Sequence, residues 1–176
     1  MRRRERSVCA RLAAFAAAAM LAHAFGVPGM LGCTPALAAS NKVRITQLSD
    51  VAFGSITNLS VDAIRSESVC LFADTSTNGY NITASGNGSA GAFELSSGLQ
   101  SLPYEVQWSG SSGQSSGVQL APNTPLTGQF SSATQQTCAS GPATSASLVL
   151  VLRSLALSSA TAGTYNGTLT LVVGPE

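Results

Sequence analysis

Short β-type runs separated by turn residues recur along the chain from residue 43 onward. The runs cover residues 43–45, 51–53, 68–72, 80–83, 92–95, 104–108, 148–152 and 165–173. The same region is crowded with Ser, Thr, Gly, Asn and Ala and is poor in the residues that build helix faces, so helix is disfavoured almost throughout. Strand and turn signals repeated at this spacing predict an all-β sandwich or barrel.

The last run has the clearest alternation of apolar and polar positions. Its apolar positions are Tyr165, Leu169, Leu171 and Val173, and the polar ones are Asn166, Thr168 and Thr170. Because successive side chains of a strand point to opposite faces, this pattern predicts a half-buried strand that stops at residues 174–176.

The run at 148–152 is apolar at every position, unlike the last one. In a two-layer sandwich, one face of such a strand would be left exposed unless something covers it. The cover could come from this chain or from another.

Turn residues separate the runs. Asn78-Gly79, Asn87-Gly88 and Gly141-Pro142 favour the backbone angles of tight turns. The serine- and glycine-rich stretch at 109–117 has strand-like sequence on both sides, which predicts a long hairpin loop rather than a linker.

The N-terminal residues have the three parts of an export signal. A basic head at 1–6 precedes an alanine-rich apolar run that reaches about residue 27, and small residues follow at Ala36 and Ala38. This order predicts a secretory signal peptide over 1–38, cleaved after Ala38. The remaining 39–176 are enough for one domain with a real core.

Two other uses of the N-terminal segment fit the sequence less well. A membrane anchor is disfavoured because the apolar run carries His23 and Gly26 and is mostly alanine, which partitions weakly into lipid. Lipidation at Cys33 is a minor alternative, since a glycine precedes this cysteine but the two residues before it fit a lipoprotein signal poorly. The mature chain is therefore not expected to be an integral membrane protein.

Removing the signal changes the charge balance. The mature chain keeps four basic and seven acidic residues, with no basic cluster. The electrostatic footprint of a nucleic-acid or anionic-membrane binder is missing, so neither partner is expected.

Cysteine counting predicts one disulfide. Cys9 and Cys33 leave with the signal, so that Cys70 and Cys138 have a single possible pairing. In an exported chain they should be oxidised, and closing a loop of roughly 70 residues would stabilise the fold by about 4 kcal/mol. Two thiols without any histidine do not make a metal site, and no cofactor is expected.

Candidate catalytic groups are scarce. The mature chain has no histidine and one lysine, Lys42, and its densest acids are Asp50, Asp62, Glu67 and Asp74. Their spacing fits surface and turn carboxylates better than a paired-carboxylate site, so we do not expect an enzyme.

Two aromatic residues leave an alternative open. Trp108 with Tyr104 could form a sugar-stacking platform of a carbohydrate-binding module, although a core tryptophan is the commoner role in a sandwich.

Four segments resemble one known family. They read DVAFG at 50–54, GAFEL at 91–95, LPYEVQW at 102–108 and AGTYNGTLTL at 162–171. Together they resemble the spore coat protein U domain, a group similar to the Csu-type archaic chaperone-usher pilins. The likeness covers nearly the whole mature chain, and the last segment is the most specific.

The resemblance implies an immunoglobulin-like antiparallel β-sandwich that lacks its last strand. In such pilins a periplasmic chaperone, and then the N-terminal extension of the next pilin subunit, supplies that strand, and an outer-membrane usher completes the pathway to the cell surface. It also implies that residues near the C-terminus form the accepting edge. These residues are Gly163, Tyr165, Leu169, Leu171, Val173 and, as the terminal group held by the chaperone, Glu176.

The segment after the expected cleavage site departs from the pilin pattern. A donor extension should alternate apolar residues over a long stretch, but 39–48 has only Val43 and Ile45 in phase before Gln47. We therefore expect a subunit that accepts a strand but donates none, as a tip or terminating subunit would. A self-complete secreted coat protein is the alternative among structural proteins.

Overall fold

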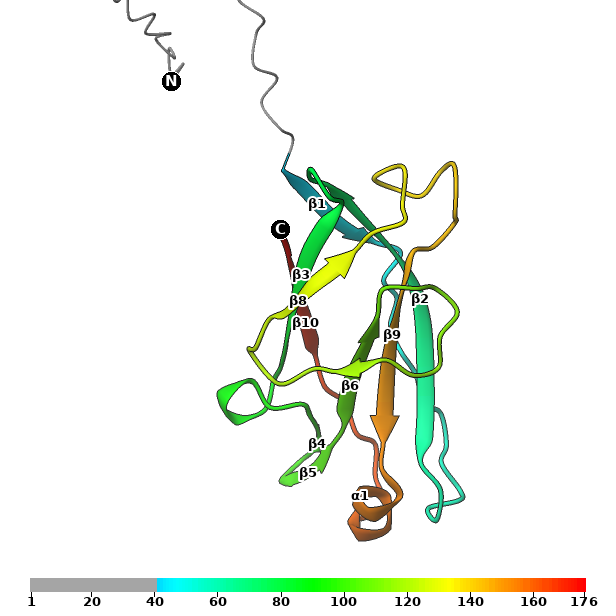
Figure 1. Cartoon of the computed structure of the whole chain (residues 1–176). Coiled ribbons are helices and arrows are strands. Elements are labelled where there is room, and N and C mark those ends of the chain that lie inside the picture. The colour runs from blue at the N-terminus through cyan, green and yellow to red at the C-terminus, as the bar shows by residue number, and fades with distance from the viewer. Residues whose placement is uncertain (1–40) are drawn as a thin grey trace, which may run out of the picture. The chain divides into compact units, whose positions relative to one another are not determined.

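The computed structural model describes residues 41–176 (Figure 1). The expected signal peptide at 1–38, its cleavage site and Cys33 lie outside the described residues.

Ten strands and two short helices make up the domain. The strands are β1 (Lys42–Thr46), β2 (Ala63–Asp74), β3 (Gly79–Gly86), β4 (Glu94–Ser97), β5 (Gln100–Pro103), β6 (Glu105–Ser109), β7 (Val118–Gln119), β8 (Leu126–Phe130), β9 (Ala146–Leu152) and β10 (Leu169–Pro175). A 3-10 helix, η1 (Ser89–Gly91), follows β3, and α1 (Ser154–Ser159) follows β9. The expected all-β class is confirmed.

Two antiparallel sheets form the layers. One has the strand order β1-β2-β9-β6-β7, the other has the order β10-β3-β8, and β4 and β5 form a separate hairpin. The side chains of β2, β6 and β9 meet those of β3 in one apolar core. Across it, Trp108 Nε1 on β6 donates a hydrogen bond to Tyr80 Oη on β3 at 2.9 Å. The sandwich is therefore tied through its centre by a polar contact as well as by packing.

The outer face of β9 is covered by this chain itself. Every residue of β9 is buried. The β6–β7 loop crosses β9 and β2 (Figure 1), and its Gln114 N–H donates to Ser147 Oγ at 3.0 Å while its Gly113 N–H donates to Ser68 Oγ at 3.0 Å. The predicted long hairpin loop at 109–117 is confirmed, because β6 and β7 pair antiparallel on either side of it.

One expected strand is absent, and two others begin at least two residues later than expected. Residues 51–53 form no strand, because this stretch makes no backbone ladder and is held by side chains instead. The last run starts at Leu169 rather than at Tyr165, since Asn166 forms an isolated bridge with Ser96. The run at 92–95 is strand only from Glu94 onward.

Five elements had no matching expectation: η1, β5, β7, β8 and α1. α1 has only six residues, a length at which propensity alone does not produce a stable helix. Its first N–H group, from Ser154, donates to Asp62 Oδ1 at 2.8 Å. This helix depends on a carboxylate far away in the sequence, which no local pattern could reveal.

Candidate functional site

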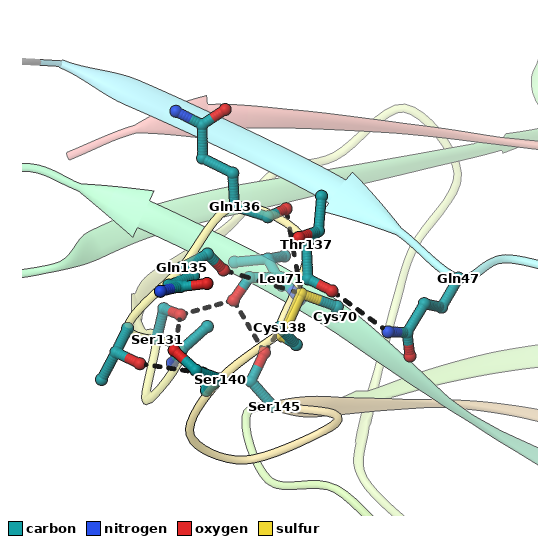
Figure 2. Close-up of a disulfide and its surroundings, with 12 residues drawn as sticks. Gln47, Cys70, Leu71, Ser131, Gln135, Gln136, Thr137, Cys138, Ser140 and Ser145 are labelled. Carbon is teal, nitrogen blue, oxygen red and sulfur yellow. Dashed lines mark hydrogen bonds between the residues drawn. A yellow bond between two sulfur atoms is a disulfide. The ribbon is translucent and has the colours of Figure 1, made fainter.

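The disulfide between Cys70 and Cys138 is confirmed, with Cα atoms 5.9 Å apart. It ties β2 to the loop between β8 and β9 (Figure 2). Ala133 and Phe72 pack beside it in a small second core. The loop also reaches the end of β1, because Gln47 Nε2 donates to the Thr137 carbonyl at 3.3 Å. The disulfide therefore stabilises the outer face of the five-stranded sheet.

Four strands form the edges of the two large sheets, and three of them are protected. β1 carries two exposed cations, Lys42 and Arg44. β7 has only two residues. β8 has a register shift in its pairing with β3 and a left-handed Gly128 with φ of 69°. Charge, shortness and irregularity are the usual means by which proteins prevent pairing at a sheet edge.

The fourth edge, β10, has none of these features. It pairs with β3 without a register shift, from Leu169 opposite Gly86 to Pro175 opposite Tyr80, and it contains no charged residue. Within residues 41–176, no strand pairs with its other edge, and no backbone hydrogen bond from a loop reaches that edge. β10 is a regular, uncharged strand edge without a partner strand in the described part of the chain.

The direction of the main-chain groups follows from one bond. Glu176 N–H donates to the Gly79 carbonyl of β3 at 3.1 Å. Because the two main-chain groups of a strand residue point to the same side and this side alternates along the strand, Leu169, Leu171 and Val173 turn their N–H and C=O groups to the open edge. Pro175 falls in the same phase, where its missing N–H costs no bond to β3.

A seam of half-buried apolar side chains lies where the first and last strands meet. β1 and β10 contact each other across the two layers. We call this the terminal-strand seam, and its residues are Val43, Ile45, Leu169, Leu171 and Val173. All pack against the core but stay partly exposed, whereas Leu71 and Ile82 in the centre of the sheets are fully buried. The core is therefore only partly shielded from solvent at this seam.

Side chains of β2 hold the segment that follows β1. Arg65 donates from Nε to the Ala52 carbonyl at 3.2 Å and from Nη2 to the Phe53 carbonyl at 2.9 Å. Its guanidinium lies 5.9 Å from the centre of the Phe53 ring. Glu67 Oε1 accepts from Ser49 N–H at 2.8 Å. This segment therefore covers part of the core without using its backbone in a sheet.

The residues expected at the accepting edge are not all on β10. Leu169, Leu171 and Val173 are, with their side chains toward the core. Gly163 and Tyr165 precede the strand: a Cβ at Gly163 would lie 2.9 Å from Ser97 Oγ, and Tyr165 Oη donates to the Thr161 carbonyl at 2.9 Å.

Glu176 follows β10, and its side chain has a partner within the domain. Its Oε2 atom accepts from Gly128 N–H at 2.7 Å. Glu176 therefore links the end of β10 to β8 across β3.

The expected sugar-stacking pair is in the core. Trp108 is fully buried and Tyr104 is 8% exposed. Tyr104 packs against Phe93, with ring centres 5.8 Å apart, and burial raises the pKa of its hydroxyl. The alternative of a sugar platform at these positions is wrong, because neither ring is presented to a ligand.

Of the four acids singled out in the sequence, Asp62 and Glu67 make structural contacts. Arg153 donates from Nη1 to Asp62 Oδ2 at 2.8 Å and from Nε to Glu105 Oε1 at 2.9 Å. The hydrogen bond from Ser154 N–H, together with Arg153, lowers the pKa of Asp62, and the same carboxylates raise the pKa of Arg153. Each carboxylate here has a partner in the fold, so the cluster clamps α1 to β6.

Two further kinds of site are missing from residues 41–176. No three His, Cys, Asp or Glu side chains come together there in a way that could hold a metal ion. In the same residues, no helix has the length and apolar character needed to cross a membrane.

Comparison with known proteins gives a fold relationship. No family model matches the sequence, and no curated protein matches it. Among solved structures, the domain is similar to a chain of the one described as "Chaperone-tip adhesin complex is vital for synergistic activation of CFA/I fimbriae biogenesis". The TM-score is 0.50 and the identity 16%, over 77% of this chain and 41% of that chain. The match therefore spans less than half of the neighbour, and it shows a shared fold.

Proposed function

We propose that this protein is a structural, non-enzymatic subunit of a bacterial cell-surface fimbria or coat, exported through the periplasm, and that β10 accepts a strand from another protein. The observation that carries the proposal is the edge of β10, which is regular, uncharged and open beside the terminal-strand seam. An exposed edge of this kind is an aggregation hazard unless a partner strand covers it.

The geometry of the edge supports strand addition. Leu169, Leu171 and Val173 point their side chains toward the core and their main-chain groups outward. A strand placed opposite them would bond to these groups and turn its own alternate side chains onto the seam. Main-chain hydrogen bonds then supply affinity, and apolar positions supply register, as in other cases of β-strand addition.

β1 belongs to the accepting domain. It pairs with β2 from Lys42 opposite Asp74 to Thr46 opposite Cys70, and Val43 and Ile45 pack on the core. These two side chains are therefore not free to serve a neighbouring subunit. This supports the role of a subunit that accepts a strand, at a tip or at another terminal position of the assembly.

The fold relationship supports the same class of partners. The similar chain belongs to a structure described as a chaperone–tip adhesin complex in fimbria biogenesis. We propose that a periplasmic chaperone, an outer-membrane usher and neighbouring pilin subunits are the partners here, as the resemblance to spore coat protein U domains and pilins implies.

Strand acceptance can be tested with synthetic peptides. A peptide of about nine residues that alternates Val with Ser or Thr should bind, raise the Tm and slow hydrogen exchange of the Leu169, Leu171 and Val173 amides. A matched control peptide carries N-methyl groups on every second amide, in the phase that bonds to β10, and should not bind. A protein that melts cooperatively as a monomer and responds to no strand peptide would instead be the self-complete coat protein.

A further inference from the structure

We infer that, without a partner strand, two copies of this protein pair through β10 as an antiparallel, two-fold symmetric dimer centred on Leu171. The two three-stranded sheets would then join edge to edge into one continuous sheet (Figure 1 shows β10 at the end of its sheet).

The outward-facing groups of β10 are self-complementary. Leu169, Leu171 and Val173 are the residues that turn N–H and C=O to the open edge. They are symmetric about Leu171, so an antiparallel copy places Leu171 opposite Leu171 and Leu169 opposite Val173. Each of these pairs exchanges both of its hydrogen bonds. Two-fold interfaces bring the same surface of both subunits together, and this edge meets that requirement.

The side chains beside the ladder do not oppose the pairing. In this register Val172, which is 59% exposed, lies opposite Thr170 of the second copy. A β-branched pair of this kind is favourable across two strands. The nearest acid, Glu176, falls opposite Asn166, and Pro175 falls opposite Gly167. No like charges meet, and the ladder ends where Pro175 has no N–H to donate.

The other three edge strands of the two large sheets are charged, too short or irregular. Lys42 and Arg44 lie on β1, β7 is too short to make a ladder, and β8 is irregular at Gly128. β10 is the one edge strand of the two large sheets, among the described residues, that a second copy could extend in register. The inference does not require that the edge accept a foreign strand, so it stands or falls independently of the proposed function.

Sedimentation velocity over a concentration series tests the inference. The purified protein should dimerise with a Kd on the order of 10 µM, as expected for a small interface. Val172→Lys places an ammonium on the exposed face of the edge strand. In the dimer this ammonium lies diagonally across from the same ammonium of the second copy, and the repulsion should weaken the dimer by at least about tenfold. The matched control is Thr83→Lys. Thr83 lies opposite Val172 on β3, one strand in from the edge. It should leave the dimer intact.

Hydrogen exchange gives a second test that needs no variant. The amides of Leu169, Leu171 and Val173 should become protected as the protein concentration rises. The amides of Thr170 and Val172 bond to β3 and should be protected at every concentration. A protein that stays monomeric at about 100 µM, or one in which Val172→Lys dimerises as the wild type does, overturns the inference. If the monomer still binds strand peptides, the proposed function survives that result.

Discussion

Ser145 bonds to both main-chain groups of Leu71: its Oγ accepts from the Leu71 N–H at 2.8 Å and donates to the Leu71 carbonyl at 2.7 Å (Figure 2). β9 starts at Ala146, so its backbone ladder with β2 ends before it reaches Leu71. The serine side chain takes the place of the next rung. Because Leu71 is fully buried, its N–H group has no access to water as a substitute.

Ser145→Ala should therefore destabilise the domain by about 1–3 kcal/mol, because it leaves the buried Leu71 N–H without a partner. Urea unfolding measures the loss. Ser140→Ala is the matched control, since Ser140 is exposed in the same loop and should change stability by no more than about 0.5 kcal/mol. Equal effects of the two changes would contradict the role assigned to Ser145.

Tyr80→Phe should cost about 1–3 kcal/mol for a similar reason. The change removes the acceptor of the Trp108 indole N–H in the fully buried core and leaves the packing almost unchanged. Thermal or urea unfolding is the measurement. Tyr165→Phe serves as the control, because its hydroxyl bond to Thr161 lies near the surface and its loss should cost about 0.5 kcal/mol or less.

Loss of the disulfide should be the largest single effect. Changing Cys70 and Cys138 together to Ser should lower the free energy of unfolding by about 4 kcal/mol, since the bond closes a loop with a sequence separation of 68. Unfolding of the oxidised wild type with and without a reductant gives an independent value. A double variant as stable as the oxidised wild type would contradict this estimate.

Acid should remove the contribution of Asp62. The hydrogen bond from Ser154 N–H, and then Arg153, lower the pKa of Asp62 in the folded state below its ordinary value of 3.8. A carboxylate with a depressed folded pKa stabilises the protein at pH values above the unfolded pKa, and this stabilisation is lost as pH falls through the folded pKa.

The difference in the free energy of unfolding between wild type and Asp62→Asn should therefore be largest near neutral pH and should shrink below about pH 4. Urea unfolding from pH 7 to pH 2 measures it. A constant difference for Asp62→Asn across the range would show that its charge plays no part.

The local pattern of the sequence predicted burial correctly where apolar and polar residues alternate along a strand that packs on the core. Leu169, Leu171 and Val173 are half-buried, as their spacing predicts. The same pattern continued to Tyr165 in the sequence, but the strand does not, because Asn166 pairs with Ser96 of β4 instead. The competing partner lies far away in the sequence, so alternation alone could not place the start of the strand.

The pattern of apolar and polar residues could not predict where a segment lies relative to the other elements of the fold. The predicted strand at 51–53 is replaced by a segment held by Arg65 and Glu67, whose reach depends on the placement of β2. The open edge of β10 includes Leu169 and Leu171 but not Gly163, since the direction of each main-chain group depends on pairing with β3.

The order of side chains along the chain determined the all-β class, the disulfide partners and the apolar face of the last strand, because each depends on residue type and on the period of a strand. Only the tertiary structure decided which chain covers β9 and which edge of which sheet is left open. Both depend on which strands become neighbours, and that choice rests on contacts between residues far apart in the sequence.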